Sequence, residues 1–188
     1  MASRTIHIFR ASLQGDPTVY RALGRSLGTQ IVYREIEIRS IASLERLAAV
    51  IVTAFNFDFD HTFGFYSELS GRNVLRSEPR YEVFRDLGER TDSLSVKRTT
   101  VGDAFSKPGH TMLFLFDYGD EWHFVVELLR IGTAEKGTRY PRLTKVHGVA
   151  PEQYPESARN GSLTSGGRVL PVALYVLAMI AIKVGAHN

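Results

Sequence analysis

Residues 112–131 constrain the fold more than any other stretch, because two apolar runs flank one polar segment that contains a glycine. The runs, 112–116 and 122–131, are rich in aromatic and aliphatic side chains that suit a buried, pleated surface. Between them, residues 117–121 are typical turn formers. The pattern predicts a β-hairpin. Its first strand is apolar on both faces, so we expect that strand to be central and covered from both sides.

The remaining periodicity predicts an α+β fold with a mainly antiparallel sheet. Residues 43–56 predict a helix across one face, with Ser43 as its N-cap. The opening order of strand, strand, helix and strand is β-grasp-like. We expect strands near 5–13, 31–39, 62–68, 111–117 and 122–131.

The alternation of side chains along a strand assigns the residues of the first two strands to opposite faces of the sheet. We expect these two strands to pair with each other. In the first strand, Ile6 and Ile8 share one face, and Phe9, Ala11 and Leu13 share the other. The second strand directs one set of side chains inward and a charged set to water. The inward set is Val32, Ile36 and Ile38, and the outward set is Glu35, Glu37 and Arg39.

In the other segments, apolar residues do not recur at a regular spacing. Residues 71–98 predict an excursion over the surface, and residues 132–155 predict a loop. A Gly/Ser-rich linker at 160–167 separates a domain at 1–159 from an apolar C-terminal helix at 168–188.

The apolar run from Val169 to Ile182 predicts a packed helix and not a membrane span. Its 14 residues would cover about 21 Å of a roughly 30 Å hydrocarbon core. We expect it to pack against the domain or against a second copy, which would make a homo-oligomer.

Composition narrows the class of protein. The chain has no cysteine, which excludes disulfides and thiolate metal sites, and its start lacks the apolar region of a signal peptide. We therefore expect a cytoplasmic protein. A net charge of +3 permits an anionic partner without requiring one.

The hairpin resembles the plasmid pRiA4b ORF-3-like family. The signature residues are Asp117, Gly119, Asp120, Trp122 and His123 in the turn and at the start of the second strand. The resemblance extends over about residues 5–156 through further motifs, which are the segments 33–38, 43–47, 101–105, 140–142 and 147–151. The family includes passenger proteins of insertion elements, of the TnpR type, and plasmid open reading frames. It implies a fold and a mobile-element context, but no mechanism.

Two classes of function follow from the polar residues. Between residues 130 and 147 the chain carries five basic residues against only Glu135, with Tyr140 and His147 interleaved, a composition that suits contact with a phosphate backbone. The basic residues are Arg130, Lys136, Arg139, Arg142 and Lys145, and we expect Arg139, Arg142 and Lys145 to contact the anion. The first hypothesis is therefore a non-enzymatic binding or accessory module with nucleic acid or a protein as partner and no cofactor. A solvated basic loop is the plainer interpretation of the same residues.

The rival hypothesis is a metal-dependent hydrolase acting on phosphodiesters. Asp58, Asp60 and His61, helped by Asp117 and Asp120, carry the ligand types that suit a divalent metal. Their spacing matches no established metal motif, and turn formation explains the same aspartates. The chain also lacks the motifs of nucleophilic serine enzymes and a phosphate-binding loop.

Overall fold

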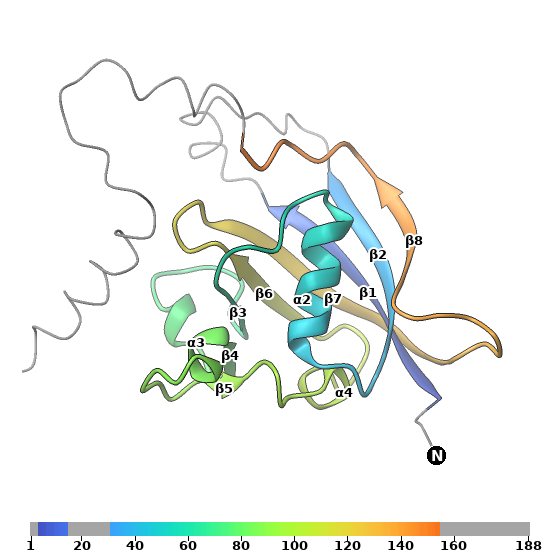
Figure 1. The fold of residues 1–188 in the computed structure, drawn as a ribbon, viewed down its shortest axis with the longest axis horizontal. Coiled ribbons are helices and arrows are strands. Elements are labelled where there is room, and N and C mark those ends of the chain that lie inside the picture. The colour runs from blue at the N-terminus through green and yellow to red at the C-terminus, as the bar shows by residue number, and fades with distance from the viewer. Residues whose placement is uncertain (1–3, 15–30, 155–188) are drawn as a thin grey trace, which may run out of the picture. The chain divides into compact units, whose positions relative to one another are not determined.

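The computed structural model of the chain describes residues 4–14 and 31–154. Among these residues, eight strands form one mostly antiparallel sheet with the order β5-β4-β3-β6-β7-β1-β2-β8 (Figure 1). The expected α+β class is confirmed. The elements are β1 (Thr5–Gln14), β2 (Val32–Arg39), α2 (Leu44–Ala54), β3 (Phe63–Tyr66), the 3₁₀ helix η1 (Val74–Arg76), β4 (Arg80–Glu82), α3 (Val83–Asp86), β5 (Leu94–Ser95), α4 (Val101–Ala104), β6 (Thr111–Phe116), β7 (Trp122–Thr133) and β8 (Arg142–His147).

The central hairpin forms as the sequence predicts. Strands β6 and β7 pair antiparallel, with Phe116 opposite Trp122. Strand β6 lies between β3 and β7 and is covered on both faces, because Leu113 and Leu115 are buried on one side and Phe114 and Phe116 on the other.

Helix α2 lies across one face of the sheet, called here the helix face (Figure 1). The Ser43 hydroxyl accepts a hydrogen bond from the Arg46 amide at 3.2 Å, so the predicted N-cap is confirmed. The buried side of α2 packs on an aromatic core that includes Phe9, Phe114 and Phe124. The opposite side of the sheet is the reverse face.

A buried arginine holds the end of α2. Arg34 Nε donates to the Ala54 carbonyl oxygen at 2.8 Å, and its guanidinium carbon lies 4.6 Å from the centre of the Phe55 ring. Nη1 also donates to the carbonyl oxygens of Tyr33 and His147, both at 2.9 Å. Arg34 therefore ties α2 to both β2 and β8.

Two segments predicted as irregular contain regular structure, so those predictions are wrong in part. The 71–98 stretch includes η1, β4, α3 and β5, and it buries Tyr81, Val83 and Val96. The 132–155 stretch contains β8, which pairs with β2 at the edge of the sheet. Strand β8 is exposed over most of its length, so its sequence lacks the alternation that burial imposes.

The predicted linker at 160–167 and the predicted C-terminal helix at 168–188 lie outside the described residues. Within the part of the chain that is described, no helix is long and apolar enough to cross a membrane.

Candidate functional site

The reverse face of β7, β1, β2 and β8 carries several charged side chains that the pairing of these strands brings together. On β2 the inward positions Val32, Arg34, Ile36 and Ile38 are buried toward α2, which places Tyr33, Glu35, Glu37 and Arg39 on the reverse face. Among the described residues, no helix covers this part of the reverse face. Its side chains therefore form the leading candidate for a binding surface.

A first group on this face, the Tyr33 cluster, comprises Arg10, Tyr33, Glu35, Lys145 and His147. Arg10 pairs with Glu35 at 2.9 Å, and its guanidinium carbon lies 4.7 Å from the centre of the Tyr33 ring. The His147 ring stacks on Tyr33 with centroids 4.8 Å apart and planes inclined by 18°. Lys145 Nζ lies 5.5 Å from the same ring centre. One tyrosine therefore gathers three basic side chains from β1 and β8.

The cations of the Tyr33 cluster are held in their charged forms. Hydrogen bonding to Glu35 raises the pKa of Arg10 above its ordinary value. Contact with the Tyr33 hydroxyl, aided by the Glu35 carboxylate, raises the pKa of Lys145. The cluster therefore presents fixed positive charge beside aromatic rings at neutral pH.

A second group, the Tyr140 cluster, lies further along the same edge and comprises Glu37, Arg39, Glu135, Tyr140 and Arg142. Arg142 Nε donates to Glu37 Oε2 at 2.6 Å, and this bond raises the pKa of Arg142. The guanidinium carbons of Arg39 and Arg142 lie 4.9 and 5.6 Å from the Tyr140 ring centre. The Tyr140 hydroxyl accepts from the Glu135 amide at 3.2 Å. Here too an aromatic ring is packed between cations.

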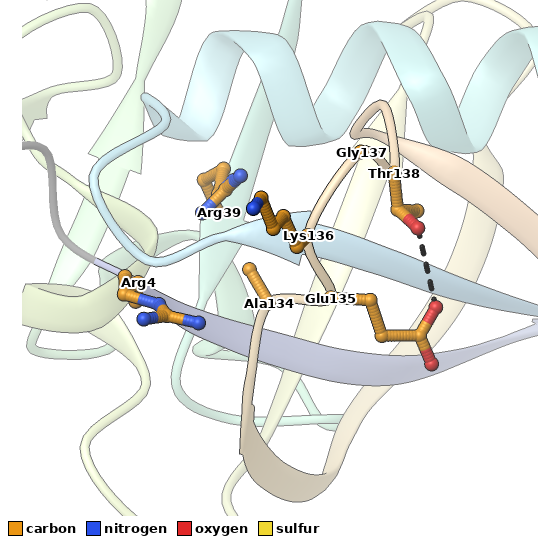
Figure 2. Close-up of a pocket in the computed structure, with 7 residues that line it drawn as sticks. All are labelled: Arg4, Arg39, Ala134, Glu135, Lys136, Gly137 and Thr138. Carbon is orange, nitrogen blue, oxygen red and sulfur yellow. Dashed lines mark hydrogen bonds between the residues drawn. The ribbon is translucent and has the colours of Figure 1, made fainter.

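A pocket of about 340 Å³ adjoins the Tyr140 cluster, where β1 begins, β2 ends and the chain leaves β7. Figure 2 shows its cationic side chains: Lys136 extends toward Arg39, and Arg4 enters from the start of β1. Glu135 is directed to the other side, where its Oε2 accepts from Thr138 Oγ1 at 3.2 Å and lies 3.4 Å from Arg142 Nη2. We call this the Arg39 pocket; its lining is Arg4, Arg39, Ala134, Glu135, Lys136, Gly137 and Thr138.

The basic residues singled out from the sequence are only partly brought together. Arg142 and Lys145 project from β8 onto the reverse face, as their contacts with Glu37 and Tyr33 show. Arg139 is exposed in the connection between β7 and β8. Arg142 is engaged by two carboxylates, so Arg139 and Lys145 are the more available of the three for an anion.

The acidic and histidine residues form a short chain of contacts. His61 Nδ1 lies 2.7 Å from Asp60 Oδ1, and His61 Nε2 lies 3.5 Å from Asp117 Oδ2. The Asp58 backbone amide donates to Gln153 Oε1 at 2.6 Å, and Gln153 Nε2 donates to Asp60 Oδ1 at 3.5 Å. The two ring nitrogens of His61 thus face different carboxylates. Within residues 4–14 and 31–154, no three His, Asp or Glu side chains group closely enough to hold a metal ion.

The hairpin signature residues have structural contacts. Asp117 Oδ1 accepts from the amides of Gly119 at 2.8 Å and Asp120 at 3.3 Å, and Asp117 itself has a φ of +59°. Trp122 is buried against Phe57, with ring centroids 4.5 Å apart. His123, half-buried, follows on the reverse face of β7. These contacts account for the turn and for the core beneath it.

Comparison with known proteins agrees with this fold. The family model described as Plasmid pRiA4b ORF-3-like protein matches residues 26–156. The chain belongs to the plasmid pRiA4b ORF-3-like family.

The fold of this chain is similar to that of a solved structure. It is the crystal structure of the protein of unknown function MM3350 from Methanosarcina mazei Go1, with 18% identity and a TM-score of 0.60. The similarity covers 80% of this chain and 73% of the other chain. No curated protein matches the chain. The family model thus shows the family of the chain, and the neighbour supports its α+β fold.

Sequence reasoning included Lys136 in the basic segment but missed Arg4, Arg10 and Tyr33 as members of the site. One signal was available, because Tyr33 shares the outward parity of Glu35, Glu37 and Arg39 on β2. Arg4 and Lys136 are brought together only by the pairing of β1 with β7. Chemically, the reverse face can hold anions and stack planar groups.

Proposed function

We propose that this protein is a non-enzymatic module that binds single-stranded nucleic acid on the reverse face of β1, β2 and β8. The observation that carries the proposal is the repeated placement of an aromatic ring among cations, at Tyr33 and again at Tyr140. Cationic side chains meet the phosphates, and planar side chains stack with bases, which is how single strands are bound without strong sequence preference.

The spacing of the two clusters suits an extended strand. Tyr33 and Arg39 lie at opposite ends of β2, six residues apart, which corresponds to about 20 Å at a strand rise of roughly 3.3 Å per residue. The exposed His147 ring, already stacked on Tyr33, offers a planar surface on which a base can continue the stack. A duplex would meet the same face only through its backbone, so we expect single strands to bind more tightly.

The hydrolase hypothesis receives less support from the geometry. A metal ion needs ligand atoms that converge on one point, whereas His61 directs its two nitrogens to separate carboxylates. We therefore favour binding over hydrolysis.

A fluorescence anisotropy titration tests the proposal directly. The probe is a labelled single-stranded oligonucleotide of about 10 nucleotides, a length within the range of such sites. If about three phosphates are neutralised, the affinity should fall roughly 100-fold for each tenfold rise in salt. Binding that is absent at low salt, or that does not change with salt, contradicts the proposal.

Two variants locate the surface. Lys145→Glu should weaken binding at least about tenfold, because it reverses a charge beside Tyr33. The matched control is Lys107→Glu, which reverses an exposed charge between α4 and β6, outside both clusters. Equal loss in the two variants would show that net charge, and not the reverse face, governs binding.

A further inference from the structure

Strand β8 gives the described part of the sheet a long open edge. It ends the strand order on one side, whereas β5, with only two residues, ends it on the other (Figure 1). Among residues 4–14 and 31–154, no strand pairs with β8 on the side away from β2. An edge strand presents a row of backbone N–H and C=O groups that can pair with another strand. The sheet can therefore be extended at β8.

An irregularity in the register places two apolar side chains of β8 on one face. Leu143 lies opposite Ile36 and Val146 lies opposite Arg34, and both of these β2 residues point to the helix face. In a regular strand, residues three apart would lie on opposite faces. Thr144 is an extra residue without a partner in the β2 register, and it brings Leu143 and Val146 to the same face. Both apolar side chains are exposed there.

The same irregularity makes β8 complementary to itself. Residues that lie directly opposite each other in an antiparallel pair share a face of the sheet. Suppose that two copies of β8 pair about a two-fold axis between Thr144 and Lys145. Leu143 of each copy then lies opposite Val146 of the other, and both members of each pair belong to the helix face. Without the extra residue, this register would set an inward position against an outward one.

The polar positions of β8 are compatible with this pairing. Arg142 of each copy would lie opposite His147 of the other, and Lys145 would lie opposite Thr144. Each Arg142 is already paired with Glu37 of its own copy at 2.6 Å. Like charges directly opposite each other destabilise a strand pair, and this register opposes none at neutral pH.

We infer that β8 is a dimer interface, at which two copies of this chain pair their edge strands antiparallel about a two-fold axis between residues 144 and 145. The partner is a second copy because the apolar and charged positions of β8 match those of β8 itself in this register. The inference does not depend on the proposed function. It adds to that function, since the two reverse faces would join into one continuous surface.

Sedimentation velocity of the full chain over a dilution series tests the inference. We expect a dimer in reversible equilibrium with the monomer. Val146→Lys should weaken the dimer at least about tenfold, because it sets a charged group against Leu143 of the second copy. The matched control is Leu87→Lys, which introduces the same charge at an apolar position that follows α3 and is 61% exposed, against 60% for Val146. This control should leave the dimer unchanged.

Engineered thiols test the register. The chain has no cysteine, so no native thiol competes. In the proposed register, position 143 of one copy faces position 146 of the other at a Cα separation of about 4.5–5.5 Å, which a disulfide can span. A mixture of full-length Leu143→Cys and Val146→Cys proteins should therefore form a mixed disulfide with oxidised glutathione as the oxidant. Either protein alone should cross-link poorly, because its two thiols are three residues out of register. Neither substitution introduces a charge, so this test stands even if Val146→Lys fails to fold.

Each possible result decides the inference. A full chain that stays monomeric throughout the dilution series overturns it. If the chain dimerises but Val146→Lys has no more effect than Leu87→Lys, the dimer is held by another surface, and the inference is again overturned. If each single-cysteine protein cross-links as readily as the mixture, the two-fold register is wrong. Binding of single strands is measured separately, so the proposed function is unaffected by any of these results.

Discussion

His7 shows how one buried side chain links the fold to pH. It lies on the helix face of β1, is 3% exposed, and its Nε2 donates to the Phe105 carbonyl oxygen at 3.0 Å. That bond leaves Nδ1 as the nitrogen without a proton, and within the described residues Nδ1 has no hydrogen-bond partner. Protonating it would bury a charge and a donor, and burial accordingly lowers the pKa of His7 below its ordinary value.

The first prediction follows from the sign of this shift. Because the folded pKa is lower than the unfolded pKa of 6.5, the unfolded chain takes up a proton first as the pH falls. Stability from His7 is fully present above pH 6.5 and decreases below it, by at most about 1.4 kcal/mol per pH unit. Urea unfolding on either side of pH 6.5 should show a smaller decrease in His7→Gln than in wild type. An unchanged pH dependence in His7→Gln would contradict the prediction.

At the scale of secondary structure, the junction of α2, β2 and β8 depends on Arg34. The last turn of α2 contains no basic residue, so the cation that complements the helix C-terminus comes from β2 instead. Burial lowers the pKa of Arg34, yet an arginine remains charged at any ordinary pH. Its partners are backbone carbonyl oxygens and the Phe55 ring.

The second prediction concerns the loss of this junction. Arg34→Met keeps most of the apolar volume but leaves the carbonyl oxygens of Ala54, Tyr33 and His147 without their donor. We expect the free energy of unfolding to fall by about 2–4 kcal/mol, measured by urea denaturation. Arg34→Lys should recover only part of it, because an ammonium cannot span the same acceptors. The exposed Arg72→Met is the matched control, and an equal effect in both variants would refute the role assigned to Arg34.

For Arg34, the periodicity of the sequence predicts the burial of the side chain but not its hydrogen-bond partners. The period of two that assigns Val32, Ile36 and Ile38 to the interior also assigns Arg34 there, so its burial was available from the sequence. The hydrogen-bond partners of Arg34 could not be predicted from the sequence, because Ala54 and His147 are brought to it by tertiary packing. The strongly patterned elements β1, β2, α2, β6 and β7 were predictable for the same reason: a buried face enforces periodicity.

Strand β8 illustrates the opposite case. Leu143 and Val146 are exposed at 45% and 60%, so burial imposes no alternation on this edge strand. Its pairing with β2 instead rests on backbone hydrogen bonds and on reverse-face contacts such as that between Arg142 and Glu37. Because these contacts join residues about a hundred positions apart, the sequence predicted a basic segment but not the surface it forms.

At the scale of the whole molecule, the chain carries an apolar C-terminal run that the described residues do not include. Our third prediction concerns this run, Val169 to Ile182, which is too apolar to remain in water. Burying several of its side chains at roughly 1.5–3 kcal/mol each would outweigh the cost of ordering it. Deleting residues 168–188 should therefore lower thermal stability or solubility.

Comparison of the full chain and the deletion variant tests this expectation by thermal melting and sedimentation. A second measurement, the oligomeric state of the full chain, separates packing against its own domain from association between copies. If deletion leaves stability and solubility unchanged, the run is dispensable for folding. Release of the protein from membranes on deletion would identify the run as an anchor.

The alternation of side chains along β2 has a consequence for divergence within the family. Even-numbered positions from Val32 to Ile38 build the core, and odd-numbered positions from Tyr33 to Arg39 build the reverse face. The odd positions, and the residues of β8 on the same face, can therefore be substituted without loss of the fold, because the even positions maintain the core. Family members with the same backbone can therefore bind different ligands. The binding partner of each member has to be established from its own residues on the reverse face and cannot be inferred from family membership.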